Sequence, residues 1–243
     1  AFRIARLYTG KHKIISRYNS YHGSTAGALA ATGDVRRWQA EPSGVIDGVI
    51  FGPECNCYRC PMGREKETCK TICADYIEYM IENEGNVAAV IVEPIAGGTG
   101  FLVPPKGYLK RLREICDRHG ILLIFDEVIC GFGRTGKPFA SQSFDVTPDI
   151  ITMAKALTNG TVPMGAVAFR DEIYHAVVDR GPDDAIELFH GYTYSGPPVA
   201  CPAGQAALAI YLTEGRFDRA PKPEPHWIVA AFSLLVSYQH LTP

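Results

Sequence analysis

The chain has 243 residues, of which 47% are hydrophobic and 21% charged, a composition typical of a globular protein of one large or two small domains. Its formal net charge of −2 gives no electrostatic reason to expect a nucleic-acid or membrane partner. No apolar run approaches the roughly 20 residues of a membrane-spanning helix. The first residues also lack the layout of a signal peptide, so we expect a cytoplasmic protein.

The first third of the chain mixes regular and irregular patterns. Residues 1–8 resemble the later turns of an amphipathic helix, and residues 13–18 read as a strand. Residues 24–32 are small and alanine-rich, which predicts a helix capped by Ser24 or Thr25. A long irregular excursion is expected over residues 33–66, because glycine, proline and cysteine are frequent there and no period is sustained.

From residue 67 onward, helical and strand patterns alternate. Helices are predicted over 67–84, from 104 to 119, from 171 and over 199–212. Buried strands are predicted over 87–92, 121–125 and 150–153, and a further strand over 165–169. This alternation predicts an α/β fold with a mostly parallel central sheet flanked by helices. We expect one large domain over residues 1–217 and an atypical tail over 218–243, in a fragment of a longer chain.

Five of the eight cysteines lie in one segment, at Cys55, Cys57, Cys60, Cys69 and Cys73. Cys57 and Cys60 have the spacing of a zinc knuckle, but Cys69 and Cys73 are separated by three residues in a predicted helix, and no histidine joins the cluster. Reduced thiols in a loop over a domain edge are therefore favoured over a zinc site, and we expect no metal.

The segment from Gly131 to Gly136 matches the G-x-G-x-x-G fingerprint of dinucleotide-binding proteins. The fingerprint needs a helix N-terminus directly after its glycines, and Lys137-Pro138-Phe139 continues a helix poorly. Asp126 and Glu127 would also place two negative charges near the pyrophosphate. We therefore disfavour a nicotinamide or flavin site.

Two strand ends carry side chains that suit a pyridine aldehyde cofactor. Asp126 follows one apolar run and Lys155 follows the next, so both should lie at the carboxyl edge of the sheet, where ligands bind. A buried carboxylate keeps a pyridine nitrogen protonated, and a partly buried amine is neutral often enough to attack an aldehyde. The competing interpretations are a surface or helix-capping carboxylate and a solvated lysine.

Two further segments offer contacts to the same ligand. In Tyr21-His22-Gly23, an aromatic ring can stack on a flat cofactor and the glycine permits close backbone approach. A core tyrosine and a hydrogen-bonded structural histidine are the simpler interpretations. Thr193 can donate its hydroxyl to a phosphate, although taken alone it is a turn threonine.

Taken together, five segments resemble motifs of the class III pyridoxal-phosphate aminotransferases, which have the aspartate-aminotransferase fold type. They are SYHGSTAGALAATG, VIVEPIAGGTG, LLIFDEVICGFGRTG, PDIITMAKALTNG and FHGYTYSGPPVAC, and they stand in the family's order and spacing. The resemblance implies that residues 1–217 are a large domain, truncated at its N-terminus, that binds pyridoxal 5′-phosphate. It also implies that residues 218–243 start a missing C-terminal domain.

The resemblance assigns roles to the residues of the catalytic centre. Lys155 would hold the cofactor covalently and move a proton between the substrate's α-carbon and the cofactor's C4′. Asp126 would pair with the ring nitrogen, while Tyr21 and Val128 would pack on the two faces of the ring. His22 and Gly23 share the Tyr21 turn and are assigned to the cofactor site with it.

Two more roles depend on parts of the assembly outside these residues. Thr193 would bind the cofactor phosphate of a neighbouring subunit, which implies a homodimer. Glu93 resembles the family's gate carboxylate, which pairs with an arginine of the C-terminal domain.

The resemblance implies transfer of an amino group from an ω-amino acid or primary amine to pyruvate or another keto acid. The CNCYRCPMG insert and Ile129, where 4-aminobutyrate and ornithine enzymes usually have glutamine, favour the ω-amino-acid:pyruvate group, including taurine and β-alanine types. Two alternatives remain open: a racemase or aminomutase of the same family, and a truncated, inactive homologue.

Overall fold

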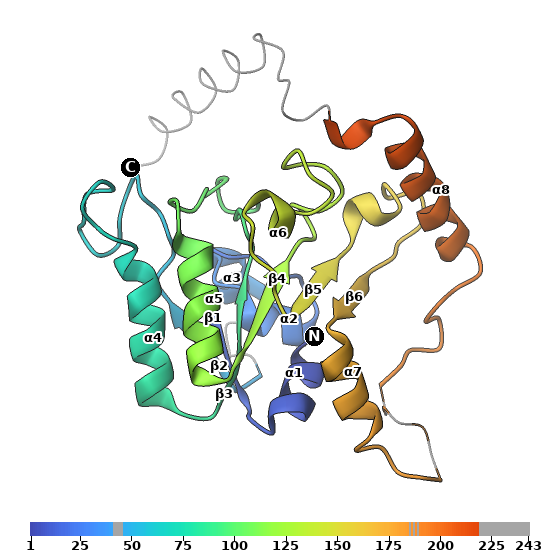
Figure 1. The fold of residues 1–243 in the computed structure, drawn as a ribbon, viewed down its shortest axis with the longest axis horizontal. Helices are drawn as coiled ribbons and strands as arrows, with labels where there is room; N and C mark the ends of the chain where they lie inside the picture. Colours follow the sequence, from blue (N-terminus) through green and yellow to red (C-terminus); the bar gives the residue numbers. More distant parts are fainter. Residues whose placement is uncertain (41–45, 185, 187, 189, 219–243) are drawn as a thin grey trace.

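A six-stranded sheet forms the centre of the computed structural model, which describes residues 1–40, 46–184, 186, 188 and 190–218. Its strand order is β2-β1-β3-β4-β5-β6, and all neighbours are parallel except the antiparallel pair of β5 and β6 (Figure 1). The bounds are β1 Lys13–Arg17, β2 Val49–Gly52, β3 Val87–Val92, β4 Leu122–Asp126, β5 Ile150–Met153 and β6 Ala166–Phe169. The predicted α/β fold with a mostly parallel sheet is confirmed.

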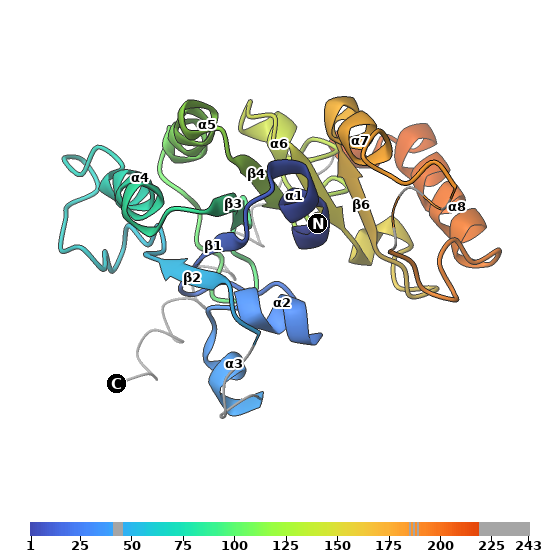
Figure 2. The same cartoon turned by 90° about the horizontal axis from the view of Figure 1, so that it is seen from below.

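Helices flank this sheet on both sides. Their bounds are α1 Phe2–Thr9, α2 Ala26–Ala31, α3 Val35–Ala40, α4 Ile72–Glu84, α5 Tyr108–His119, α6 Ala140–Ser143, α7 Asp171–Val178 and α8 Ala200–Thr213, with 3-10 turns η1 Lys155–Leu157 and η2 Arg216–Asp218. Seen from below, α4 and α5 lie on one side of β1 and β2, whereas α2 and α3 lie on the other (Figure 2).

Alternate residues of the central strands enter two separate cores. The core under α4 and α5 takes Ile15, Val90, Val92, Leu123 and Phe125, whereas the core under α1 and α7 takes Ile14, Ala89, Ile91, Leu122 and Ile124. Because successive strand side chains point to opposite faces, this requires apolar residues at every position. The unbroken apolar runs in the sequence are therefore explained by a sheet that is covered on both faces.

The sequence prediction was wrong in the segment over residues 33–66, which contains α3 and the edge strand β2. Val49–Gly52 is short and pairs only with β1, so its pattern was too weak to separate from a loop. Helix α4 also begins later than expected, at Ile72, which leaves Cys69 outside it. Thr25 occupies the N-cap of α2 without a side-chain bond, and Ser24 contacts Tyr21 instead.

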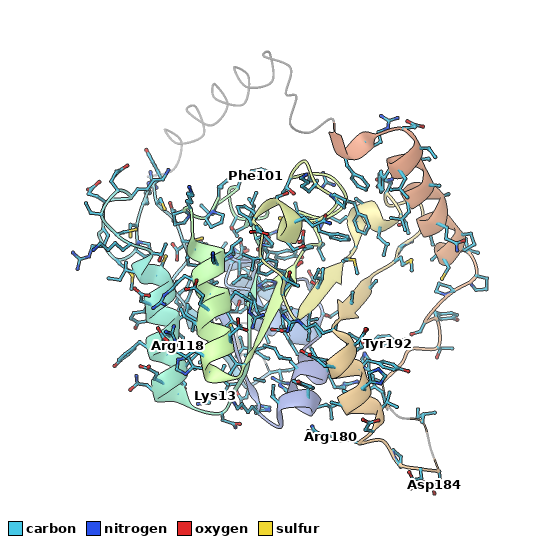
Figure 3. The ribbon with its side chains drawn as sticks, in the orientation of Figure 1. Lys13, Phe101, Arg118, Arg180, Asp184 and Tyr192 are labelled. Carbon is cyan, nitrogen blue, oxygen red and sulfur yellow. The ribbon has the colours of Figure 1, made fainter. Side chains whose placement is uncertain are left out.

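Polar contacts join the end of α7 to the end of α1. Arg180 donates from one guanidinium nitrogen to the carbonyls of Leu7 and Tyr8, at 2.8 and 3.0 Å, and so binds the last turn of α1 (Figure 3). In the part of the chain that the structure describes, none of the helices has the length and apolar character that crossing a membrane requires. The predicted tail over 218–243 lies outside the described residues, apart from Asp218 at the end of η2.

Candidate active site

A cavity of about 1140 Å³ opens on the sheet edge where the parallel strands end. Asp126 and Val128 after β4, Thr152 and Met153 of β5, and His22 after β1 line one part of it. Residues of α1, α2, β6 and the segment 190–197 also line it. This agrees with the rule that ligands bind outside the carboxyl ends of strands in open α/β sheets.

The carboxylate of Asp126 is buried in this cavity and held by two neighbours. Its Oδ2 lies 2.7 Å from Nδ1 of His22, and its Oδ1 accepts the backbone N–H of Val128 at 3.1 Å. Because a carboxylate only accepts, His22 must carry a proton on Nδ1. Asp126 is thus neither a helix cap nor a surface carboxylate, and His22 is the hydrogen-bonded histidine that the sequence favoured.

Lys155 follows β5 at the same sheet edge. Asp126 pairs with Thr152 across β4 and β5, and Lys155 comes just after Met153 and Ala154. The expected burial of its amine is wrong, because Lys155 is exposed and does not line the cavity. Its amine makes no hydrogen bond or ion pair with any residue in the described ranges.

The backbone at Lys155 is constrained although its side chain is exposed. Its φ of 46° lies in the left-handed region, which costs a non-glycine residue roughly 1–2 kcal/mol. Tyr211 of α8 stabilises the turn, because its hydroxyl donates to the carbonyl of Ala156 at 2.6 Å and lies 2.9 Å from Oδ1 of Asn159. Strained backbone that its surroundings hold in place is frequent at functional sites. No local sequence pattern indicates this support.

The Tyr21-His22-Gly23 turn reaches the cavity through His22, and Tyr21 itself does not line it. One face of the Tyr21 ring is covered by Arg36, whose Cζ lies 4.3 Å from the ring centroid. Gly23 has a φ of +130°, and a Cβ there would be 3.0 Å from Cβ of Ala28. Only glycine fits this turn without strain. The stacking of Tyr21 on a cofactor remains a prediction.

Glu93 is buried at the end of β3 and bonded to two backbone segments. Its Oε1 accepts the N–H of Tyr21 at 2.9 Å and its Oε2 accepts the N–H of Gly97 at 3.1 Å. Burial raises the pKa of this carboxyl group, although these hydrogen bonds oppose the shift. Beneath it, the buried guanidinium of Arg17 donates to the Glu93 carbonyl at 2.8 Å, a role that the sequence analysis missed.

Thr193 lies on the exposed segment 190–197. Its neighbours Tyr192 and Tyr194 line the cavity, whereas Thr193 faces solvent and does not line it. Its predicted contact with a phosphate in a neighbouring subunit remains a prediction.

The glycine-rich loop after β4 does lead to a helix, the short α6, which begins at Ala140. The carboxylate of Glu127 fills this helix start, since Oε2 accepts the N–H of Ala140 at 2.8 Å and Oε1 accepts the N–H of Ser141 at 2.7 Å. A pyrophosphate would have to displace a buried carboxylate from those donors. The structure therefore gives a physical reason against the dinucleotide interpretation.

The cysteine segment 55–73 contributes to the core. All five of its cysteines are free, and Cys55 and Cys73 belong to the core under α4 and α5. Among the described residues, the side chains close enough to share an ion are Glu78, Glu82 and His119, whose ligand atoms lie within 4.8 Å of one another. Glu78 is already paired with Arg111 and Arg118. The expected absence of a metal remains a prediction.

The cavity suits a flat cofactor with a basic ring nitrogen. It offers a buried carboxylate, Asp126, which can accept a hydrogen bond from a protonated pyridine nitrogen. Next to it, Nε2 of His22 is buried without a hydrogen-bond partner among the residues described. These features agree with the pyridoxal phosphate that the sequence motifs imply.

Comparison with known proteins identifies related chains. The family model described as aminotransferase class-III matches residues 1–225. An omega-aminotransferase of Caulobacter vibrioides is 47% identical over 96% of this chain and 54% of its own length. An omega-amino acid–pyruvate aminotransferase of Pseudomonas putida is 45% identical over 89% of this chain and 49% of its own. A leucine/methionine racemase of Thermococcus litoralis is 44% identical over 91% of this chain and 48% of its own length.

A solved structure shows the same fold. The taurine:2-oxoglutarate aminotransferase of Bifidobacterium kashiwanohense, in complex with PLP and glutamate, superposes with a TM-score of 0.80. It is 41% identical, and the match covers 88% of this chain and 47% of that one. The chain thus spans about half the length of the relatives that it matches.

Proposed function

This chain belongs to the class-III aminotransferase family, and we propose that it is the cofactor-binding part of a pyridoxal-phosphate-dependent transaminase. The whole protein would move an amino group from an ω-amino acid or a primary amine to pyruvate or another keto acid. Bound pyridoxal phosphate would supply an electron-withdrawing ring that accepts the electrons released at the substrate's α-carbon.

The observation that carries this proposal is the buried pair of Asp126 and His22 in the cavity beside the end of β5. Both oxygens of Asp126 have hydrogen-bond partners, and a carboxylate beside a pyridine nitrogen favours the protonated form of that nitrogen. Asp126 can therefore hold the proton of a ring nitrogen that binds beside it. His22 fixes the orientation of that carboxylate through its Nδ1–H.

Lys155 is the proposed attachment point and base. The Nζ atom of Lys155 would take the proton from the substrate's α-carbon, because Lys155 follows β5, the strand that pairs with β4 at Asp126, and so lies at the same sheet edge. Its exposure in this chain leaves it free of protein partners. We propose that the missing half of the protein and a second subunit cover it and exclude water.

Other residues complete the proposed site. Val128 lines the cavity close to Asp126 and would pack on one face of the ring. Tyr21 would stack on the other face, and Gly23 in the same turn would allow the backbone to approach the cofactor closely. Thr193 would donate its hydroxyl to the cofactor phosphate of a partner subunit, so the protein would act as a homodimer. The exposed position of Thr193 on segment 190–197 supports this assignment.

The role of Glu93 as a gate carboxylate is compatible with its position but requires a change in its contacts. Both of its oxygens accept backbone N–H groups in this chain. To pair with an arginine of the absent domain, Glu93 would need either to share these oxygens or to release one of them. Its charge would then be favoured by the arginine, against the effect of burial.

A second candidate function follows from the racemase relative. At 44% identity over 228 residues, that relative is nearly as similar as the named transaminases. A racemase would use the same lysine to remove and return the α-proton, without consuming a keto acid. Consumption of added pyruvate by the full-length enzyme would favour the transaminase, and inversion of a chiral amino acid without pyruvate would favour the racemase.

Borohydride reduction in the presence of pyridoxal phosphate, followed by peptide mapping, tests the proposal. We expect the label at Lys155, and none in a Lys155→Ala variant. Lys106, Lys110 and Lys137 are internal controls, because they are surface lysines of the same chain. A label spread over these lysines, with none preferred at Lys155, would overturn the assignment.

A further inference from the structure

Arg36 makes a set of contacts beside the candidate site that the family motifs leave unassigned. Its guanidinium lies over the Tyr21 ring, with Cζ 4.3 Å from the ring centroid. Its Nε donates to Oδ1 of Asp34 at 2.7 Å, and its Nη2 donates to Oδ2 of Asp34 at 3.1 Å. Nη2 also reaches the carbonyl of Gly98, at 3.2 Å. These three hydrogen bonds fix the plane of the guanidinium.

Hydrogen bonds hold both the backbone and the hydroxyl group of Tyr21. Its backbone N–H donates to Oε1 of Glu93, at 2.9 Å, and its hydroxyl lies 2.8 Å from Oγ of Ser24. These bonds restrict the backbone and the tip of the side chain but leave the rotation of the ring to its packing. The planar cation of Arg36 on one face supplies that restraint.

Gly98 provides room for this contact. A Cβ at position 98 would lie 3.3 Å from Cβ of Tyr21 and 3.4 Å from Nη2 of Arg36. A side chain there would therefore press on both partners. Arg36, in the first turn of α3, thus bonds Asp34 before this helix and Gly98 in the turn after β3. Its guanidinium packs on the Tyr21 ring between them.

We propose that Arg36 is a positioning residue for Tyr21, covering one face of its ring so that the other face is held ready for the cofactor. This inference rests on the proposed function, because it assigns Tyr21 to the cofactor. A lysine would not replace Arg36 fully, since an ammonium group lacks the planar fork that bonds Asp34 and Gly98 together.

A double-mutant cycle on pyridoxal phosphate affinity tests the inference with the full chain. The dissociation constant is obtained from borohydride labelling of Lys155 at increasing cofactor concentration. We expect Arg36→Met to weaken binding about two- to fivefold with Tyr21 present, and to have no effect in a Tyr21→Leu background. Arg36→Lys should fall between Arg36→Met and the unaltered chain.

Arg59→Met is the matched control, because Arg59 is another exposed arginine whose Cζ lies 5.8 Å from a tyrosine ring, that of Tyr58. It should leave cofactor affinity unchanged. Near-UV circular dichroism of each variant checks that the fold is kept, and a misfolded Arg36→Met is replaced in the cycle by Arg36→Lys.

The outcomes separate the two claims. Equal loss of affinity in both Tyr21 backgrounds would make Arg36 a merely structural residue and overturn the inference. So would unchanged affinity in Arg36→Met with Tyr21 present. Absence of labelling at Lys155 in the unaltered chain would overturn the proposed function, and the positioning role with it.

Discussion

His22 and Asp126 lie 104 positions apart in the chain, yet Nδ1 of His22 is 2.7 Å from Oδ2 of Asp126. Both side chains are nearly inaccessible, with 2% and 6% of their surface exposed. The contact joins the turn after β1 to the end of β4, across the intervening strand β3. A buried carboxylate with one histidine and one backbone N–H is thereby fixed in the wall of the cavity.

Replacement of this carboxylate tests its assigned role. Asp126→Asn keeps the size of the side chain but removes its charge, so a protonated ring nitrogen would lose a charge-assisted partner. We expect roughly 10- to 100-fold weaker binding of pyridoxal phosphate. Asp145→Asn is the control, because Asp145 is exposed. Equal affinities in the two variants would remove Asp126 from the cofactor site.

Gly27, in the first turn of α2, and Gly33, two residues after this helix, should respond in opposite directions to replacement by alanine. A Cβ at Gly33 would lie 2.1 Å from the carbonyl oxygen of Arg17, whereas a Cβ at Gly27 would have nothing within 4 Å. We expect Gly33→Ala to lower the free energy of unfolding by about 1–3 kcal/mol. Gly27→Ala should raise it by about 0.5–1 kcal/mol, because glycine is a poor helix residue. Urea denaturation measures both, and a stable Gly33→Ala protein would contradict the close packing of β1 against this turn.

The buried Glu93 should make stability fall as pH rises. Its folded-state pKa is raised from the ordinary value of 4.5, chiefly by burial, so the native state keeps a proton that the unfolded chain has already lost. The resulting stability is fully present below pH 4.5 and is lost as pH rises through the folded-state pKa. Unfolding free energies measured from about pH 4 to about pH 8 should show that decline.

The matched variants for this titration are Glu93→Gln and Glu67→Gln. Glu93→Gln cannot ionise and should flatten the decline, even if losing one backbone bond lowers stability at every pH. Glu67 is exposed, so Glu67→Gln should keep the original slope. Burial also raises the pKa of Glu127, and that residue should supply the slope that remains in Glu93→Gln. An identical slope in both variants would exclude Glu93 as its source.

The hydroxyl of Tyr211 should stabilise the turn that carries Lys155. Tyr211→Phe leaves the carbonyl of Ala156 without its 2.6 Å donor, in a buried position. We expect a loss of about 1–2 kcal/mol in unfolding free energy, together with slower labelling of Lys155. Tyr174→Phe, at an exposed position of α7, should change neither. Normal stability in Tyr211→Phe would show that α8 does not support this turn.

Much of the architecture could be predicted from the sequence. The runs Val87–Val92 and Leu122–Asp126 are apolar at nearly every position, which indicated parallel strands covered on both faces. The edge strand β2 could not be predicted, since four residues that pair on one side only carry little pattern. The antiparallel direction of β6 likewise depends on the path of the chain between strands.

The order of residues along the chain was enough to establish the fold class and the order of the chemical groups. Parallel strands end at one edge, so Glu93, Asp126 and Lys155, each at or just after a strand, had to lie along that edge. The contacts of each group, in contrast, follow from the three-dimensional packing. That packing places His22 on Asp126, Glu127 at the start of α6 and Arg36 on Tyr21, and it leaves Lys155 exposed. Such contacts join segments that are distant in the chain, and no local pattern records them.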